Sequence, residues 1–225
     1  PGVRSYVPSS IDDGVIVNND FPASALAMLD AFSIPTVVVG RMVDSGRMGG
    51  VSPNFFDAYR QLFHRLDDGG IRSASLLYCG NSPVTEDLRA LSMLLPPRQC
   101  VFNVVDVAPA GLPIDYNLEF GWIEDCLRSM VDRDELPDVL CFTSDWNAHK
   151  AVLWLSERGV NVPDQVGVIG ALNLEFGAKA SPSLTTLAIE PKDIGRKAVD
   201  VLWKMVVEEQ AAVFDRVPMT LIERE

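Results

Sequence analysis

The sequence predicts an α/β protein built from parallel sheets with helices on both faces, and two observations lead to this class. Short apolar runs rich in β-branched residues recur along the 225 residues. Between them lie segments whose apolar residues repeat at helical spacing. Because apolar strands that alternate with amphipathic helices are typical of doubly wound folds, we expect parallel sheets covered by helices.

The expected elements follow one another along the chain in alternation. The strands are Gly14–Val17, Thr36–Val39, Ala74–Tyr78, Val101–Val107, Val139–Phe142, Val166–Ile169 and Leu184–Ile189. The helices are Pro22–Phe32, Phe55–Leu66, Thr85–Leu95, Leu118–Val131, Asn147–Arg158 and Pro191–Val207. Arg41–Gly50 contains several glycines and is expected to be a long, loose loop.

The last quarter of the chain carries the most specific pattern. The apolar run Val166–Ile169 stops at Gly170, where a strand gives way to a loop. Ser181-Pro182 predicts a turn before the β-branched run Leu184–Ile189. Pro191 then opens a helix at a position that tolerates a missing N–H.

This quarter combines four features: Val-Pro-Asp at 162–164, the glycine that ends the strand, Pro-x-Leu-Thr-Thr at 182–186 and Gly-Arg-x-Ala at 195–198. In these features it resembles the lactose-repressor (LacI/GalR) family of bacterial transcription regulators. The resemblance covers about Asp12–Arg224 and is to the effector-binding domain, whose fold is that of periplasmic sugar-binding proteins. It implies an allosteric homodimer that senses a sugar or related small molecule and contains no cofactor.

The resemblance also implies two periplasmic-binding-protein-like subdomains with the ligand in the cleft between them. The N-terminal subdomain would comprise residues 1–72 and 190–213, and the C-terminal one residues 73–189 and 214–225. Family members carry a helix-turn-helix head, a hinge and two further strand–helix units before the part that resembles Asp12–Val17. We therefore expect an incomplete N-terminal subdomain, a longer protein, and DNA contact only through a domain outside this chain.

Composition restricts the class of protein further. Hydrophobic residues make up 48% and charged residues 22% of the chain, as in ordinary globular proteins. No apolar run approaches the roughly 20 residues of a membrane span, and the N-terminus lacks the apolar core of a secretory signal, so we expect a cytoplasmic protein. A net charge of −12 argues against direct contact with a nucleic-acid backbone. The four cysteines lack paired metal-site spacing and are expected to be free thiols, with no metal.

Arg89 and Tyr116 are the first candidate ligand-binding residues. Arg89 lies in a segment that resembles the family's Arg-x-x-Gly-aromatic motif, although Ser92 and Met93 replace its last two residues. A guanidinium group donates several fixed hydrogen bonds, which suits vicinal hydroxyls or a carboxylate. Tyr116 falls where some family members stack an aromatic ring on a sugar. The alternatives are a solvated arginine on a helix and a tyrosine on a surface loop.

Ser144, Asp145 and Trp146 follow the strand Val139–Phe142, where the family usually has Asn-Asp before a helix. Asp145 is expected either to cap that helix or to accept hydrogen bonds from ligand hydroxyls. Ser144 in place of asparagine removes an amide that both donates and accepts. Trp146 is a candidate for lining the cleft.

Other departures from the family indicate an atypical effector. Leu172 stands where an effector-binding aspartate is common, Ile189 where a glutamine often faces the cleft, and Pro53 precedes the retained Asn54 of an Asp-Asn pair. Fewer carboxylates and amides would leave sugar hydroxyls unpaired, at a cost of about 1–3 kcal/mol each. We therefore expect a carbohydrate-like ligand but weak binding of plain monosaccharides.

Three classes of function remain to be compared. A ligand-sensing regulator agrees with the family-type segments. A solute-binding protein of a sugar transporter is the alternative, but it requires a secretion or lipoprotein signal, which the chain does not show. An enzyme is not expected, because the sequence contains no dinucleotide-binding G-x-G-x-x-G, Walker loop, G-x-S-x-G elbow or H-E-x-x-H motif.

Overall fold

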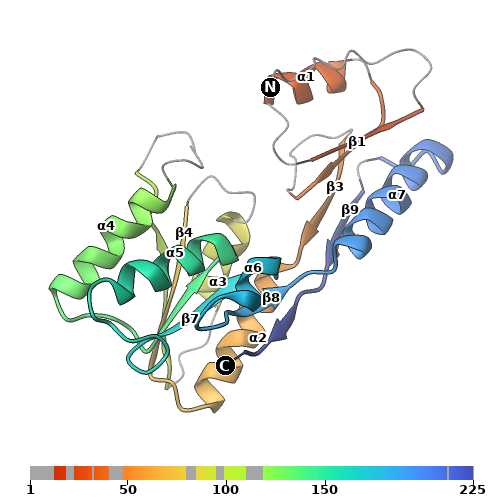
Figure 1. Cartoon of the computed structure of the whole chain (residues 1–225). Helices are drawn as coiled ribbons and strands as arrows, with labels where there is room; N and C mark the ends of the chain where they lie inside the picture. The colour runs from red at the N-terminus through yellow and green to blue at the C-terminus, as the bar shows by residue number, and fades with distance from the viewer. Residues whose placement is uncertain are drawn as a thin grey trace. The chain divides into compact units, whose positions relative to one another are not determined.

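The structure is a computed structural model that describes residues 13–18, 23–31, 33–40, 48–79, 85–94, 99–109, 119–211 and 213–224. The chain divides into two compact units (Figure 1). The first comprises Pro1–Asn54 and Glu190–Val217, and the second Phe55–Ile189 and Pro218–Glu225. Each unit contains a sheet of mainly parallel strands, so the predicted α/β class is confirmed.

The first unit contains a four-stranded parallel sheet in the order β1-β2-β3-β9. Its elements are β1 (Val15–Asn18), α1 (Ala23–Ala31), β2 (Thr36–Val39), β3 (Met48–Pro53), α7 (Pro191–Val207) and β9 (Phe214–Val217). The apolar face of α7 packs on this sheet through the buried side chains of Ile194, Ala198, Val201 and Met205. Pro191 opens α7, as the sequence predicts.

Strand β3 corrects one expectation. The end of the segment predicted as a loop, Met48–Gly50, belongs to this fully buried strand; residues 41–47 lie outside the described part. A Cβ on Gly49 would lie 2.7 Å from Met205 Sδ and 2.8 Å from Val201 Cγ1. The glycine therefore lets α7 approach the strand closely, and it does not mark a turn.

The second unit contains a six-stranded sheet in the order β10-β8-β7-β6-β4-β5, in which only the pairing of β10 with β8 is antiparallel. Its strands are β4 (Ser73–Tyr78), β5 (Val101–Asp106), β6 (Val139–Phe142), β7 (Gly167–Ala171), β8 (Thr185–Ala188) and β10 (Thr220–Ile222). Its helices are α2 (Phe55–Asp68), α3 (Thr85–Leu94), α4 (Glu119–Asp132), α5 (Asp145–Ser156) and α6 (Glu175–Lys179). The short helix α6 was not anticipated.

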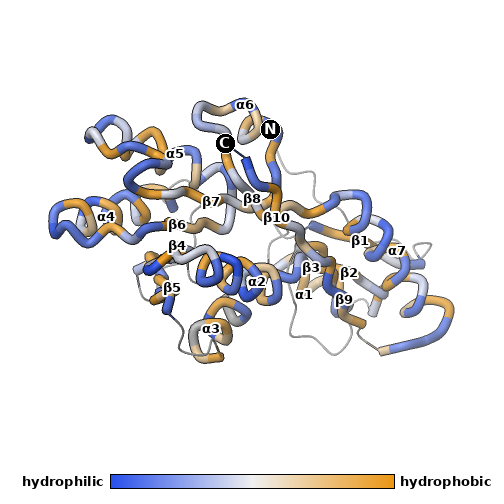
Figure 2. Tube along the Cα trace, turned by 90° about the horizontal axis from the view of Figure 1, so that it is seen from below, coloured by the Kyte–Doolittle hydropathy of each residue, from blue (hydrophilic) through white to orange (hydrophobic). Residues whose placement is uncertain are grey.

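Two buried clusters cover the two faces of this sheet. In Figure 2, α2 and α3 lie on one side of the strands and α4 and α5 on the other. Successive residues of β4 alternate between them, because Leu76 joins the cluster of α2 and α3 whereas Leu77 joins that of α4 and α5. Strands buried on both faces are nearly all apolar, which is why their runs stand out in the sequence.

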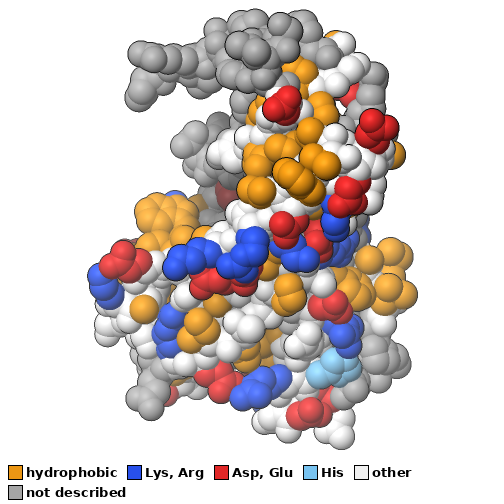
Figure 3. Space-filling model, turned by 90° about the vertical axis from the view of Figure 1, so that its right-hand side faces the viewer, with side chains coloured by type: hydrophobic (Ala, Val, Ile, Leu, Met, Phe, Trp, Pro, Cys, Tyr) orange, Lys and Arg blue, Asp and Glu red, His pale blue; other side chains and the backbone are white. Residues whose placement is uncertain are grey.

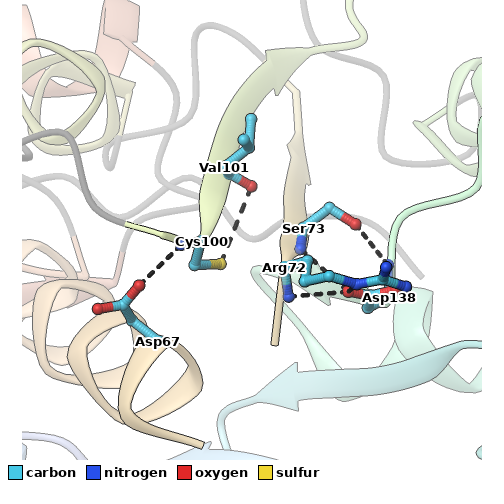
Figure 4. Close-up of polar contacts among 6 residues, drawn as sticks. All are labelled: Asp67, Arg72, Ser73, Cys100, Val101 and Asp138. Carbon is cyan, nitrogen blue, oxygen red and sulfur yellow. Dashed lines mark hydrogen bonds and ion pairs between the residues drawn. The ribbon is translucent and has the colours of Figure 1, made fainter. Parts of the chain in front are cut away.

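Two separate sets of polar contacts hold the amino ends of β4, β5 and β6 (Figure 4). Asp138 Oδ2 accepts hydrogen bonds from the backbone N–H groups of Arg72 and Ser73, at 2.8 and 3.1 Å. The Ser73 hydroxyl accepts in turn from the Asp138 N–H at 2.9 Å. Asp67, in the last turn of α2, accepts from the Cys100 N–H at 2.7 Å. These carboxylates satisfy backbone donors at the strand ends opposite those expected to bind ligand.

The unit boundaries differ from the expected ones in two places. Helix α2 was placed in the N-terminal subdomain but belongs to the second unit, because Tyr59 and Leu62 are buried in the core of that unit. Strand β9 was placed in the C-terminal subdomain but pairs with β3 of the first unit. Among the described helices, none is both long and apolar enough to cross a membrane.

Candidate ligand-binding site

The carboxyl ends of the parallel strands in the second unit bring the candidate residues together. The strand order places the ends of β8, β7, β6, β4 and β5 side by side along one edge of the sheet. Ligands of doubly wound folds bind at such an edge, because the loops and helix N-termini that follow the strands face it. We therefore describe the side chains along this edge from β5 to β8.

Arg89 projects from α3 to the ends of β4 and β5. Its Nη2 lies 3.7 Å from Oδ2 of Asp106, the last residue of β5, and its side chain is 62% exposed. It also hydrogen-bonds the side chain of Tyr78, the last residue of β4. Burial and the nearby Asp106 carboxylate raise the pKa of Tyr78, and the arginine opposes this change. Arg89 therefore combines fixed partners at the sheet edge with an accessible guanidinium group.

Glu119 is a half-buried carboxylate at the start of α4, and sequence analysis did not select it. Burial raises its pKa, while hydrogen bonds with Asn147 and Cys79 and the positive charge of Lys150 oppose that increase. Glu119 comes from one helix, Asn147 from the first turn of another and Cys79 from the end of β4. Only the fold brings these three residues together; a single acidic residue near a helix start gives no sign of them.

A cation–π cluster lies beside Glu119. Lys150 Nζ lies 5.0 Å from the ring centroids of both Phe120 and Trp146. Trp146 also meets Phe176 edge to face, with centroids 5.7 Å apart, and remains 54% exposed. The tryptophan therefore lies on the outside of the junction between α5 and α6.

Ser144, rather than Asp145, caps α5. The Ser144 hydroxyl accepts from the Asn147 N–H at 3.2 Å, and the helix begins at Asp145. Asp145 is fully buried, and its two carboxylate oxygens accept from the Thr186 hydroxyl at 2.7 Å and the Leu174 N–H at 2.6 Å. Burial raises the pKa of Asp145, and these two hydrogen bonds oppose the increase. Asp145 therefore holds the loop after β7, a role that sequence analysis did not foresee.

Leu172 lies in that loop in an unusual backbone conformation. Its φ is 87° and that of Asn173 is 54°, and residues other than glycine seldom adopt positive φ values. The Asn173 N–H donates to the Thr186 hydroxyl at 3.2 Å, and Arg224 Nη2 donates to Asn173 Oδ1 at 2.6 Å. Leu172 therefore sits half-buried in a loop fixed by several hydrogen bonds.

The remaining predicted residues are less informative. Asn54 is half-buried at the end of β3, and its backbone N–H donates to Val217 O at 2.8 Å. Tyr116 lies outside the described residues. Within the described ranges, no three His, Cys, Asp or Glu residues are grouped to hold a metal ion.

The arrangement suits binding of a polar ligand. Arg89 and Lys150 supply cationic donors, and Asp106 and Glu119 supply acceptors, all near the ends of β4, β5 and β6. Near β7 the edge presents Leu172 and backbone groups, because the buried Asp145 is occupied by Thr186 and Leu174. One half of the edge is thus polar and the other more apolar.

Comparison with known proteins agrees with the fold. A family model described as a periplasmic binding protein-like domain matches residues 78–225. The HTH-type transcriptional repressor PurR of Glaesserella parasuis is 23% identical over 94% of this chain and 61% of its own length. The PurR of Haemophilus influenzae PittEE is 28% identical over 93% and 62%. The chain thus spans about three fifths of these curated relatives.

Solved structures show the same fold. A LacI family transcriptional regulator from Arthrobacter sp. FB24, in complex with lactose, has a TM-score of 0.73 at 20% identity, covering 95% of this chain and 77% of that one. The transcriptional regulator CelR in complex with cellobiose has a TM-score of 0.71 at 21% identity, covering 95% and 65%.

Proposed function

The chain belongs to the periplasmic binding protein-like domain family and is an effector-binding domain of the LacI/GalR type; from this premise we propose that it senses a small molecule and thereby controls DNA binding. In this proposal the DNA-binding domain is a separate one, and the protein is cytoplasmic and not an enzyme. Effector binding shifts a homodimer between two states with different affinities for DNA. On the face that Figure 3 draws, Asp and Glu side chains lie beside the Lys and Arg side chains, and the net charge of −12 argues against contact of this chain with a DNA backbone.

The convergence of Arg89, Asp106, Tyr78 and Glu119 at one sheet edge carries the proposal. Both donors and acceptors are available there, as recognition of a carbohydrate-like ligand requires. The PurR relatives are repressors by name, which supports a regulator over the solute-binding protein of a transporter. Asn54 and Tyr116 remain proposed ligand contacts.

We propose that the effector is an atypical, carbohydrate-like molecule with an acidic or vicinal hydroxyl group at Arg89 and a less polar part near Leu172. The solved structures of two regulators of the same fold are complexes with lactose and with cellobiose. Here the Leu172 side chain replaces a potential acceptor, and Asp145 is buried beneath the loop. Plain hexoses and pentoses are therefore expected to bind more weakly than micromolar.

Calorimetric titration with hexoses, pentoses, lactose, cellobiose and sugar acids tests this proposal. The tightest of these ligands is then titrated into Arg89→Lys, which keeps the charge but removes the guanidinium fork. Loss of charge-assisted hydrogen bonds predicts about a tenfold or greater fall in affinity. Arg128→Lys is the control, because Arg128 is similarly exposed and pairs with Glu124 within α4. Equal affinity of the wild type and Arg89→Lys would contradict the assignment, and micromolar glucose binding would contradict an atypical effector.

The outer face of α5 and α6 supports the homodimer part of the proposal. Trp146, His149, Lys150 and Leu153 follow the i, i+3, i+4, i+7 spacing of one helix face. Trp146 and Leu153 are 54% and 50% exposed, and Phe176 of α6 adjoins Trp146. Exposed apolar side chains grouped in this way are typical of a protein interface. We therefore propose Trp146 for the dimer contact rather than for the effector.

Sedimentation of Trp146→Ser at several concentrations tests this interface. The change is expected to weaken dimerisation by about tenfold or more, since central aromatic residues contribute strongly to interfaces. Met28→Ser is the control, because Met28 lies on α1 of the first unit and is similarly exposed, at 52%. An unchanged dimer in Trp146→Ser, or equal weakening in both variants, would argue against this face.

A further inference from the structure

A hollow of about 520 Å³ lies in the second unit between α2 and the edge strand β10. Its apolar floor contains Ala58, Leu62, Leu187 and Met219, which belong to the core cluster. Its rim is polar and comes from α2 and from the residue after β10; it comprises Gln61, His64, Arg65, Asp68 and Glu223. The volume is within the range of sites that bind small molecules, roughly 300–1,000 Å³.

This hollow is separate from the carboxyl-end site. Strand β10 runs antiparallel to β8, and its last residue, Ile222, is paired with Thr186 near the start of β8. Glu223 follows Ile222, so the rim lies toward the amino ends of the parallel strands. Figure 2 shows α2 beside β10, in agreement with their direct contact.

An ion pair closes one side of the hollow. Arg65 Nε lies 2.6 Å from Glu223 Oε1, and both side chains are more than half exposed. The Arg65 hydrogen bond lowers the pKa of Glu223, so this carboxylate is charged at neutral pH. Exposed ion pairs contribute little stability because water competes for both partners. A ligand cation can therefore displace Arg65 from Glu223 with little loss of stability.

The charges of the rim indicate the kind of ligand. Asp68 and Glu223 are two carboxylates of the rim, and the chain as a whole has a net charge of −12. The floor accepts an apolar group of ring size, and Gln61 adds an amide. We propose that this hollow is a second ligand site, which binds small organic cations that have an apolar body.

Three probes that share a phenyl ring and a short alkyl chain test the inference: 2-phenylethylammonium, 2-phenylethanol and 3-phenylpropanoate. Met219 in the floor is a local reporter, since the ε-methyl signals of the seven methionines can be followed by NMR after isotope labelling. The ammonium probe is expected to shift the Met219 signal saturably and to bind more tightly than the alcohol or the carboxylate. No saturable shift of Met219, or tighter binding of the carboxylate, would overturn the proposal.

Matched variants distinguish the hollow from general surface binding. Glu223→Gln is expected to lower the affinity for the ammonium probe by about two- to fivefold, which is the effect of one exposed ion pair. Glu175→Gln is the control, because Glu175 also forms an exposed ion pair, with Lys179 on α6. Gln61→Trp changes an exposed rim residue and is expected to fill the hollow and abolish binding of all three probes. Equal effects of the two Glu→Gln changes, or retained binding in Gln61→Trp, would reject the site.

Discussion

Replacement of Gly170 by alanine tests the packing that holds the candidate site. A Cβ at this position of β7 would lie 3.0 Å from Asp145 Cα and 3.1 Å from its Cγ, and closer still to Oδ1. Rotation of the Asp145 side chain alone does not remove the clash, because the backbone Cα is also too near. The carboxylate must move away from the Thr186 hydroxyl and the Leu174 N–H, which it now contacts at 2.7 and 2.6 Å.

The expected loss follows from those two hydrogen bonds. A hydrogen bond to a charged group contributes about 1.5–3 kcal/mol, so two at the lower figure give about 3 kcal/mol. Alanine also lowers the entropy of the unfolded chain, which stabilises the variant by only about 0.5 kcal/mol. We therefore expect Gly170→Ala to lower the free energy of unfolding by about 2.5 kcal/mol or more. Asp145→Asn keeps the volume but has only one acceptor oxygen, and about half that loss is expected.

Urea unfolding and amide hydrogen exchange measure the two consequences. The urea midpoint reports stability, and exchange at Asn173 and Leu174 reports the loop, because their N–H groups donate to Thr186 and Asp145. Gly121→Ala is the control, since a Cβ on this α4 glycine would meet no atom within 4 Å. In a helix, this change is expected to be neutral or to stabilise by about 0.5–1 kcal/mol. An unchanged midpoint in Gly170→Ala with fully protected loop amides would refute the packing argument.

Two further predictions concern other carboxylates. Asp138→Ala leaves the Arg72 and Ser73 N–H groups without their acceptor and is expected to lower the free energy of unfolding in urea by about 1–3 kcal/mol. Asp164→Ala is the control: Asp164 is exposed, so its replacement is expected to change that free energy little. Burial raises the pKa of Glu119, so the folded state binds its proton more tightly than the unfolded state does. The free energy of unfolding is therefore expected to fall as pH rises from about 4.3 through the folded pKa, and Glu119→Gln is expected to remove this component. A Glu119→Gln stability curve parallel to that of the wild type across this range would contradict the assignment.

Local patterns were sufficient to predict most of the fold. Apolar runs such as Val139–Phe142 and the amphipathic helix from Pro191 are encoded by neighbouring residues, and the structure contains both. The exceptions depend on distant contacts. Gly49 lies in a strand because α7 needs the space, and α2 belongs to the second unit because Tyr59 reaches the end of β6, where its hydroxyl donates to Phe142 O at 2.7 Å. Residue spacing alone contains neither fact.

The candidate site was harder to predict because its polar residues interact over long sequence distances. Arg89 was selected from a short motif, and the structure places it beside Asp106. Glu119 was missed, since its neighbours Cys79 and Asn147 come from other elements. Asp145 was selected as a cap or a ligand contact, yet the adjacent Ser144 caps the helix. Adjacent polar residues at a helix start can exchange such roles, and only the direction of each side chain decides between them.

Three carboxylates at the same sheet edge differ in function because their surroundings differ. Both oxygens of Asp145 are occupied, and the residue is fully buried, so it can stabilise the loop but has little capacity to accept from a ligand. Glu119 is half-buried, and its carboxylate forms hydrogen bonds with the side chains of Asn147 and Cys79. Asp106 pairs at 3.7 Å with Arg89, whose side chain is 62% exposed. The polar part of an effector is therefore expected at the β4–β5 end of the edge, and its apolar part toward Leu172.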